Sequence, residues 1–275
     1  MKKGVNDLEA ILNFDLSVFK FVQDFLGYGT GGFLDKFMPV FTWLGDGAFF
    51  IIFGVVLCIF KKTRKIGIAM LLAQLVMLFA NNIILKSIFS RTRPFALFNP
   101  AVAEQCIGGY NRKGEFLEGW MKEGYLTQVL EEMKTYSAAI QQKWLSTYRY
   151  YIDIYPYAHG YSFPSGHTSS SFAAACGMLF MCKGKKQNIW GTVTVIVAAF
   201  IGFSRIYLHV HYCTDVLVGA VVGVLCGVAG YFICKAVYPY IDRLLQRVRK
   251  KNDSPAEEVK EEAVEEAVET ASEAE

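Results

Sequence analysis

The stretch from Ser204 to Asp215 combines side chains that can bind an anion and attack it. Arg205 offers a guanidinium group to an anion, and His211 offers a nucleophilic imidazole. Asp215 follows His211 by four residues, so its carboxylate can reach back and orient the ring. Long apolar runs flank the stretch on both sides. They place these polar residues at a membrane surface, where such residues are costly unless they have a function.

A second group of cations lies upstream, between Lys86 and Pro94. Lys86 and Arg93 are seven residues apart, so on a continuous helix they share a face, and Pro94 ends the helix near this point. Two converging cations suit the spread charge of a phosphoryl group. The alternative is that Lys86, Arg91 and Arg93 only extend from a helix end to lipid headgroups, and it is favoured when this stretch is taken alone.

The sequence Pro164-Ser165-Gly166-His167 predicts a helix N-terminus. Ser165 is a suitable N-cap, and Gly166 leaves the backbone uncovered, so that N–H groups can point towards a bound anion. His167, in the first turn, can deliver a proton to a leaving oxygen. Taken alone, this stretch fits a capped helix with an incidental histidine equally well.

The elements that position these residues are predicted to be membrane-spanning helices. The chain is 53% hydrophobic and only 19% charged, and several apolar runs reach the roughly 20 residues that cross a bilayer. We therefore predict an all-α, polytopic membrane helical bundle. Its predicted spans cover residues 38–60, 66–85, 165–182, 188–207 and 215–237. Residues 7–26 carry apolar positions at helical spacing with charges on the other face, which predicts an amphipathic helix in the membrane interface; a sixth span is the alternative.

Basic clusters indicate how the helices are oriented. They follow the first, third and fifth predicted spans, and the side richer in Lys and Arg is the cytoplasmic one. The three polar stretches then lie together on the extracytoplasmic face. We expect no signal peptide, because charged residues interrupt the first apolar stretch. The short loops and the lack of eukaryotic targeting signals favour a bacterial plasma membrane.

The predicted organisation has five parts. They are an interfacial helix at 1–32, two spans with the first cationic stretch at 33–94, a helical extracytoplasmic insertion at 95–162, three spans with the catalytic stretches at 163–240, and a basic, then acidic, disordered cytoplasmic tail at 241–275. Seven cysteines show no C-x-x-C pairing, so neither a zinc site nor a disulfide framework is indicated. His159 and His209 have no acidic partner at the spacing of His211 and Asp215, and we interpret them as structural or surface residues.

The three stretches follow one another as Lys-x6-Arg-Pro, Pro-Ser-Gly-His and Ser-Arg-x5-His-x3-Asp. Together they closely resemble the signature motifs of the type 2 phosphatidic acid phosphatase and vanadium haloperoxidase superfamily, over about residues 40–237. As a set, these motifs are very specific. Cys213 stands where many relatives carry Pro, which leaves the catalytic positions unchanged.

The resemblance implies a helical-bundle phosphatase that works without a metal or another cofactor. At these positions, His211 is the nucleophile that forms a phosphohistidine, and Asp215 fixes its tautomer. His167 protonates the leaving group and then activates water. The phosphate oxygens are bound by Lys86, Arg93, Arg205 and the amides near Ser165 and Gly166.

A site at the outer membrane–water boundary suits a phosphate that is tethered to a lipid. The expected substrate is a lipid phosphate or diphosphate such as phosphatidic acid, phosphatidylglycerol phosphate or undecaprenyl diphosphate. Membrane lipids are expected partners, nucleic acid is not, and the sequence does not fix an oligomeric state. Two alternatives stay open: vanadate-dependent halide oxidation, and a non-catalytic lipid-binding or transport protein. Both catalytic histidines are present, which disfavours the second of these.

Overall fold

The computed structural model describes residues 2–28, 31–89, 91, 93–94 and 161–272. These residues form helices and connecting segments, with no strand among them. The elements are α1 (Lys2–Leu26), α2 (Phe33–Phe41), the 3-10 helix η1 (Thr42–Gly45), α3 (Gly47–Ile59), α4 (Arg64–Met77), the π-helix η2 (Leu78–Leu85), α5 (Lys86–Phe89), α11 (Gly166–Met181), α12 (Lys185–Tyr207) and α13 (Cys213–Ser272). The chain forms two units, Met1–Tyr231 and Phe232–Glu275, and the three polar stretches all lie in the first.

Among the described residues, three continuous helical stretches are long and apolar enough to cross a membrane. They cover Arg64–Phe89, Gln187–Tyr207 and Cys213–Arg247. Phe33–Gly45 and Gly47–Ile59 add a fourth if they form one span bent by 54°. α11 has 16 residues and a length of about 24 Å, less than the roughly 30 Å of a hydrocarbon core. The structure thus confirms membrane-length helices in an all-helical set of described residues, whereas the predicted count of five or six spans is not confirmed.

The bend before α3 follows from the local sequence. Asp46 has an extended backbone, and its carboxylate accepts a hydrogen bond from the amide of Ala48 at 2.8 Å, so it caps a new helix. This new start falls inside the run that hydropathy predicted as one span, 38–60. The bend places two residues of η1 against the site, since Thr42 contacts α12 and Gly45 contacts α11.

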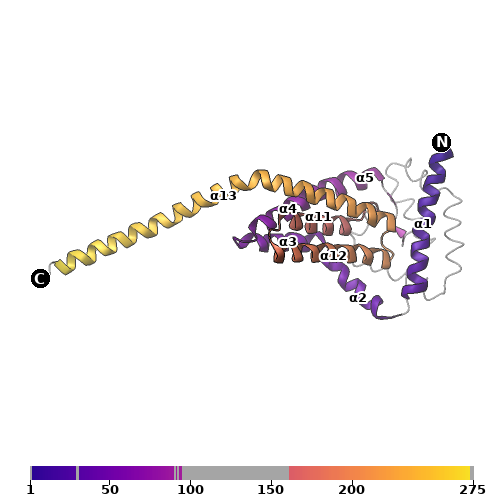
Figure 1. The fold of residues 1–275 in the computed structure, drawn as a ribbon, viewed down its shortest axis with the longest axis horizontal. Coiled ribbons are helices and arrows are strands. Elements are labelled where there is room, and N and C mark those ends of the chain that lie inside the picture. The colour runs from indigo at the N-terminus through magenta and orange to yellow at the C-terminus, as the bar shows by residue number, and fades with distance from the viewer. Residues whose placement is uncertain (1, 29–30, 90, 92, 95–160, 273–275) are drawn as a thin grey trace. The chain divides into compact units, whose positions relative to one another are not determined.

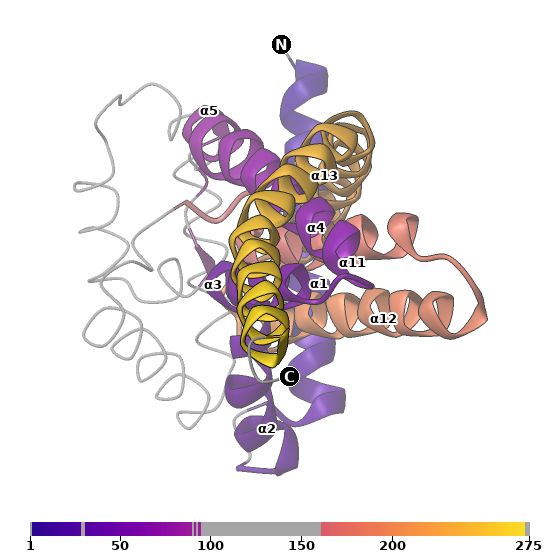
Figure 2. The same cartoon turned by 90° about the vertical axis from the view of Figure 1, so that its left-hand side faces the viewer.

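α11 lies at the centre of the first unit, between α4 and α12 (Figures 1 and 2). Small residues let helices approach closely where the surrounding lipid is as apolar as the side chains. At Gly223 of α13, for example, an added Cβ would lie 2.6 Å from Cβ of Phe172 in α11. Ser170 and Gln74 are buried and paired with each other: the Ser170 hydroxyl donates to Gln74 at 2.7 Å, and the Gln74 amide donates to the Ser170 carbonyl at 2.8 Å. The small buried residues of α11 include Ala173, Ala174, Ala175 and Gly177.

α1 runs across the end of the bundle helices rather than along them (Figure 1). Its buried residues have the spacing of one helix face, and Phe19 among them stacks on the ring of His209 with 4.6 Å between centroids. The buried stripe consists of Asp15, Phe19, Val22 and Gln23, and the exposed apolar residues include Phe14, Phe21 and Phe25. The buried stripe thus includes the charged residue Asp15, whereas the prediction placed the charges on the other face. The place of α1 in a membrane interface stays a prediction.

Two further predicted parts of the chain are the insertion and the C-terminal tail. The insertion at 95–162 lies outside the described residues except for Tyr161 and Ser162. The tail, predicted to be disordered from residue 241, is instead helical as part of α13 as far as Ser272. Residues 256–268 consist of Ala, Glu, Val and Lys. Ala, Glu and Lys are strong helix formers, which explains a helix where low hydrophobicity alone predicted disorder.

Candidate active site

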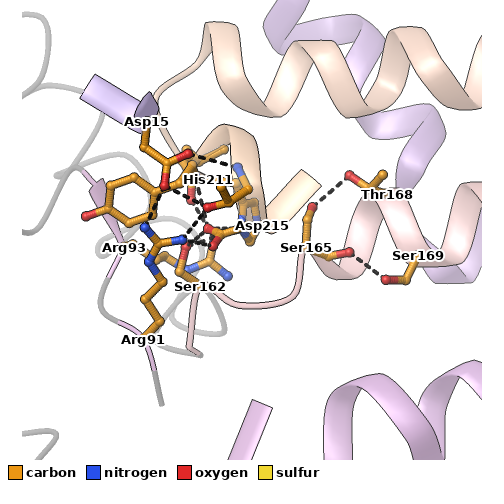
Figure 3. A network of polar contacts seen from close by, with 12 residues as sticks. Asp15, Arg91, Arg93, Ser162, Ser165, Thr168, Ser169, His211 and Asp215 are labelled. Atoms are coloured by element: carbon orange, nitrogen blue, oxygen red, sulfur yellow. Dashed lines mark hydrogen bonds and ion pairs between the residues drawn. The ribbon is translucent and has the colours of Figure 1, made fainter. Parts of the chain in front are cut away.

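The three polar stretches meet at one end of the bundle (Figure 3). His211 lies in the loop between α12 and α13, and Asp215 lies in the first turn of α13. Arg93 follows α5 and reaches His211 across 118 residues of sequence. Lys86 begins α5, and its Nζ lies 3.5 Å from the position that a Cβ on Gly166 would occupy at the start of α11.

His211 is buried, and its contacts fix its tautomer. Nε2 lies 3.1 Å from Nη1 of Arg93, while Nδ1 lies 3.5 Å from Oδ2 of Asp215 and 3.4 Å from Oγ of Ser162. A guanidinium group can only donate, so Nε2 must accept and the ring proton is on Nδ1. The N–H of the imidazole therefore faces the carboxylate, and the nitrogen with the lone pair faces a cation.

Asp215 is held through both of its carboxylate oxygens (Figure 3). Oδ1 accepts from Nη1 of Arg91 at 2.6 Å, and Oδ2 accepts from the amide of Tyr212 at 2.9 Å and from the hydroxyl of Ser162. Because the carboxylate is fully buried, these donors offset the cost of keeping it ionised. The sequence analysis missed Ser162, since no motif spacing distinguishes it at the end of the predicted insertion.

A cationic cradle forms beside His211. Arg205 is buried and donates Nη1 to the hydroxyl of Thr42 at 2.8 Å, while its Nε has no hydrogen-bond partner among the described residues. A buried donor left without a partner is costly, so it marks a position where an anion oxygen can bind. We define the cradle as Lys86, Arg93 and Arg205, the three cations whose charges act on His211.

Burial and the cradle also set the protonation state of His211. Burial first, and then the positive charges of Arg93, Arg205 and Lys86, hold the pKa of His211 well below its usual range. The imidazole is therefore neutral at neutral pH. Its Nε2 lone pair, which here accepts from Arg93, can attack an electrophile in the cradle once the Arg93 guanidinium group binds that electrophile instead.

His167 stands in the first turn of α11 and packs against η1. A Cβ on Gly45 would lie 3.1 Å from Cδ2 of His167 and would also contact Cγ2 of Ile201. The missing side chain at Gly45 thus leaves the room that the imidazole occupies. Arg205 and His211 are near enough to act on His167 electrostatically, and the positive charges around it oppose a proton on His167 until an anion in the cradle balances them. The sequence analysis did not identify η1 as a support of the site.

Ser165 corrects one prediction. Its hydroxyl makes no capping hydrogen bond to the α11 backbone but accepts from Oγ1 of Thr168 at 2.9 Å. Its amide donates to the main-chain carbonyl of Asp215 at 3.0 Å and so joins α11 to α13 instead of facing an anion. The first N–H groups of a helix have no partner within the helix, which leaves those of Gly166 and His167 as the candidate anion donors.

The relation between Lys86 and Arg93 also differs from the prediction. They do not share a face of one helix, because α5 ends at Phe89 and Arg93 lies outside it. A residue that precedes proline is disfavoured in the helical conformation, which is consistent with an early helix end before Pro94. Arg93 is held instead by the loop that carries His211, since its Nη1 donates to the carbonyl of Val210 at 3.2 Å.

Arg91 does not extend to headgroups, which was the alternative for this stretch. It is buried, its Nη2 lies 2.7 Å from Oδ2 of Asp15, and its guanidinium group lies 3.8 Å from the ring centre of Tyr212. The sequence predicted at most a headgroup contact for Arg91 and did not indicate Asp15 as a site residue. An acidic residue on the apolar stripe of α1 is the signal for Asp15, but nothing in the sequence identifies a partner 76 residues away.

His209 has a structural role, and it predicts how stability depends on pH. It is fully buried, with its ring centre 4.6 Å from that of Phe19 and 4.2 Å from that of Tyr28. Burial lowers its pKa to about 3. An unfolded histidine titrates near pH 6.5, so below that pH the unfolded chain binds a proton that the folded chain excludes. We expect the free energy of unfolding to fall by about 2 kcal/mol per such histidine between pH 7 and pH 5.

Thermal unfolding in detergent at the two pH values measures this loss. His209→Asn is the matched control, because asparagine does not titrate and tolerates the positive φ of 53° found here. The variant should lose less stability than the parent on acidification. An identical loss in both proteins would show that His209 does not contribute.

The chain is similar in sequence to known proteins. The family model described as the PAP2 superfamily matches residues 62–238, well over half of the chain. The chain is 42% identical over 78 residues to a lipid A 1-phosphatase of Porphyromonas gingivalis, covering 28% of this chain and 17% of that protein. It is 32% identical over 125 residues to phosphatidylglycerophosphatase B of Bacillus subtilis, covering 41% and 54%. The chain thus matches less than two thirds of the length of either relative.

A solved structure is also similar. It is the crystal structure of the first transmembrane PAP2 type phosphatidylglycerolphosphate phosphatase from Bacillus subtilis, with a TM-score of 0.48 and 20% sequence identity. The match covers 84% of this chain and 88% of that one.

Proposed function

Because this chain belongs to the PAP2 superfamily, we propose that it is an integral membrane phosphatase that hydrolyses a lipid phosphate or diphosphate. The observation that carries the proposal is the buried, neutral His211, whose unprotonated Nε2 faces Arg93 beside the cradle. Relatives named as phosphatases of lipid A, of phosphatidylglycerol phosphate and of undecaprenyl diphosphate support the reaction class.

In the first proposed step, Nε2 of His211 attacks phosphorus. A P–N bond forms while the P–O bond to the lipid breaks, and His167 gives its proton to the departing oxygen. Asp215 accepts the hydrogen bond from Nδ1 and stabilises the positive charge that develops on the ring. The cradle neutralises the phosphoryl oxygens, which is the main task of a protein in phosphoryl transfer.

In the second step, His167 acts as the base. It takes a proton from water as the water oxygen attacks phosphorus, the P–N bond breaks, and its electron pair returns to Nε2 of His211. One water is consumed, and one phosphate and one alcohol, or a lipid monophosphate from a diphosphate, are released. Both histidines regain their starting protonation states, so the cycle closes without a further reactant.

We propose that the lipid tail stays in the bilayer while the phosphate enters the cradle. α11 would then be the fifth span, as a short helix inside the bundle, and α1 would lie in the membrane interface. The site would face the extracytoplasmic side of a bacterial plasma membrane, with the C-terminus in the cytoplasm. The basic residues between α3 and α4 and before α12 support this orientation. A membrane-impermeant phosphate ester should be hydrolysed by intact cells that contain the protein; hydrolysis only after lysis would contradict the orientation.

The function is tested by phosphate release from purified protein in detergent. A panel of phosphatidic acid, phosphatidylglycerol phosphate, undecaprenyl diphosphate and a lipid A phosphate identifies the substrate. We expect at least one to be hydrolysed, and we expect the rate to be unchanged by excess EDTA, because Lys86, Arg93 and Arg205 supply the charge that a metal ion would otherwise provide. No hydrolysis of any substrate would overturn the proposed function, and loss of activity in EDTA would overturn its metal independence.

A further inference from the structure

A chain of buried charges connects α1 to the candidate site (Figure 3). Oδ2 of Asp15 lies 2.7 Å from Nη2 of Arg91, and Nη1 of Arg91 lies 2.6 Å from Oδ1 of Asp215. Asp15 and Asp215 are fully buried, and Arg91 is only 4% exposed. A buried ion pair loses most of its solvation, so it persists only where its geometry is specific, as it is here.

Asp15 also binds the residue immediately before Asp215. Its Oδ1 accepts from the amide of Thr214 at 2.9 Å, and its Oδ2 accepts from the Thr214 hydroxyl at 2.7 Å. That amide is one of the first of α13, which has no partner within its own helix. A side chain of α1 thus caps the helix that carries Asp215, and its negative charge lies at the favourable end of that helix.

The charges of Asp15, Arg91 and Asp215 depend on one another. Arg91 donates a hydrogen bond to Asp215. If Asp15 were absent, the positive charge of Arg91 would be balanced by Asp215 alone, and the Asp215 carboxylate would interact less strongly with the imidazole of His211. Asp15 balances that charge and fixes the guanidinium group, which also lies over the ring of Tyr212 at 3.8 Å. Asp215 can then present Oδ2 to Nδ1 of His211 at 3.5 Å.

We propose that Asp15 is a positioning residue, which acts through Arg91 and Thr214 to hold the Asp215 carboxylate against His211. α1 is then part of the catalytic apparatus, although it precedes the region that matches the family, residues 62–238. Asp15 touches neither the substrate nor the reacting nitrogen. The inference rests on the proposed function for its kinetic test and has a second test that does not need activity.

The kinetic test compares Asp15→Asn with Asp24→Asn. Both remove one negative charge from α1, but Asp24 is exposed. We expect Asp15→Asn to lower kcat about 10- to 100-fold, the usual loss when a partner that orients a functional group is removed, with KM nearly unchanged. Asp24→Asn should match the parent. A loss confined to KM, or an equal effect of both variants, would overturn the proposal.

A double-mutant cycle tests the route through Arg91. If Asp15 acts on Asp215 through Arg91, the loss caused by Asp15→Asn should be much smaller in an Arg91→Leu background. Fully additive losses would show that Asp15 acts by another route. Should Asp15→Asn fail to fold, Thr214→Val keeps all three charges and removes only the hydroxyl that links Asp15 to Arg91. It should lower kcat in the same direction, and an unchanged kcat would count against the proposal.

The second test follows the imidazole itself. In protein labelled with 15N-histidine, the Nδ1 proton signal of His211 reports its hydrogen bond to Asp215. This signal should shift or disappear in Asp15→Asn and stay in place in Asp24→Asn. An unmoved signal in Asp15→Asn would overturn the inference. This readout needs no turnover, so it tests the role of Asp15 even if the parent protein hydrolyses no lipid phosphate. In that case the proposed function would be overturned while the inference about Asp15 could still hold.

Discussion

Replacing His211 by glutamine is expected to lower the release of phosphate on the order of 10⁴- to 10⁶-fold, as the removal of a catalytic nucleophile does elsewhere. Glutamine keeps a polar side chain between Arg93 and Asp215, so the buried charges around it keep a partner. What it lacks is a nitrogen with a free electron pair that can form the bond to phosphorus. The measurement is single-turnover and steady-state phosphate release with the best substrate of the lipid panel.

A matched histidine in the same loop serves as the control. His209→Asn changes a buried histidine two residues away that lies outside the catalytic machinery, and it should retain most of the activity at pH 7. Rapid quenching of the parent with a 32P-labelled substrate should trap a protein-bound phosphate that survives alkali and is lost in acid, as a P–N bond is. His211→Gln should trap none. Retained turnover in His211→Gln, or a trapped phosphate on that variant, would exclude His211 as the nucleophile.

The parts of the site that the sequence predicted are those with regular local spacing. His211 and Asp215 are four residues apart at the start of a helix, and the structure places Nδ1 and Oδ2 at 3.5 Å. His167 was expected in a first helical turn and lies there. Such predictions depend on backbone geometry over one or two turns, which the sequence encodes locally. The spacing of Lys86 and Arg93 misled because it assumed that one helix continued past Phe89.

The site residues that the sequence did not reveal have partners that are far away in the sequence, and none of them belongs to a motif. Asp15 meets Arg91 across 76 residues, and Thr42 meets Arg205 across 163 residues. Neither Asp15 nor Thr42 has a second residue at a fixed spacing that would indicate a role. Their function depends on how α1 and η1 pack on the bundle. Packing of this kind is decided by the shape of the whole core rather than by a local pattern.

The predicted span count was limited in a similar way, because hydropathy does not show where a helix begins. Hydropathy counts apolar residues, and it predicted one span over 38–60 and another over 165–182. The structure starts a new helix at Gly47, capped by Asp46, and limits α11 to 16 residues. A single capping carboxylate is worth only about 1 kcal/mol, yet it decides where a helix begins. Averages over 20 residues cannot detect it.

His167→Gln is expected to slow the hydrolysis of a lipid phosphate by about 10²- to 10⁴-fold, the usual contribution of a general acid or base. The expected loss depends on the leaving group, and this dependence identifies the role. A lipid alkoxide is a poor leaving group that needs the proton from His167, whereas an aryl phosphate such as p-nitrophenyl phosphate releases a stable phenolate without it. The variant should therefore lose much less activity in the first, phosphoryl-transfer step with the aryl ester than with the lipid, measured as the burst of released nitrophenolate.

A variant of the cradle provides the contrast. Arg205→Lys keeps the positive charge but removes the Nε donor, which has no partner in the described part of the chain, so it should weaken the hydrolysis of both esters to a similar degree. The two roles are thereby distinguished: loss of the proton donor His167 should affect mainly the lipid ester, whereas loss of the anion-binding group of Arg205 should affect both esters. Equal losses of His167→Gln on the lipid and aryl esters would exclude His167 as the proton donor. Since Gly45 leaves room only for the imidazole that is present, such a result would reassign His167 to packing against η1.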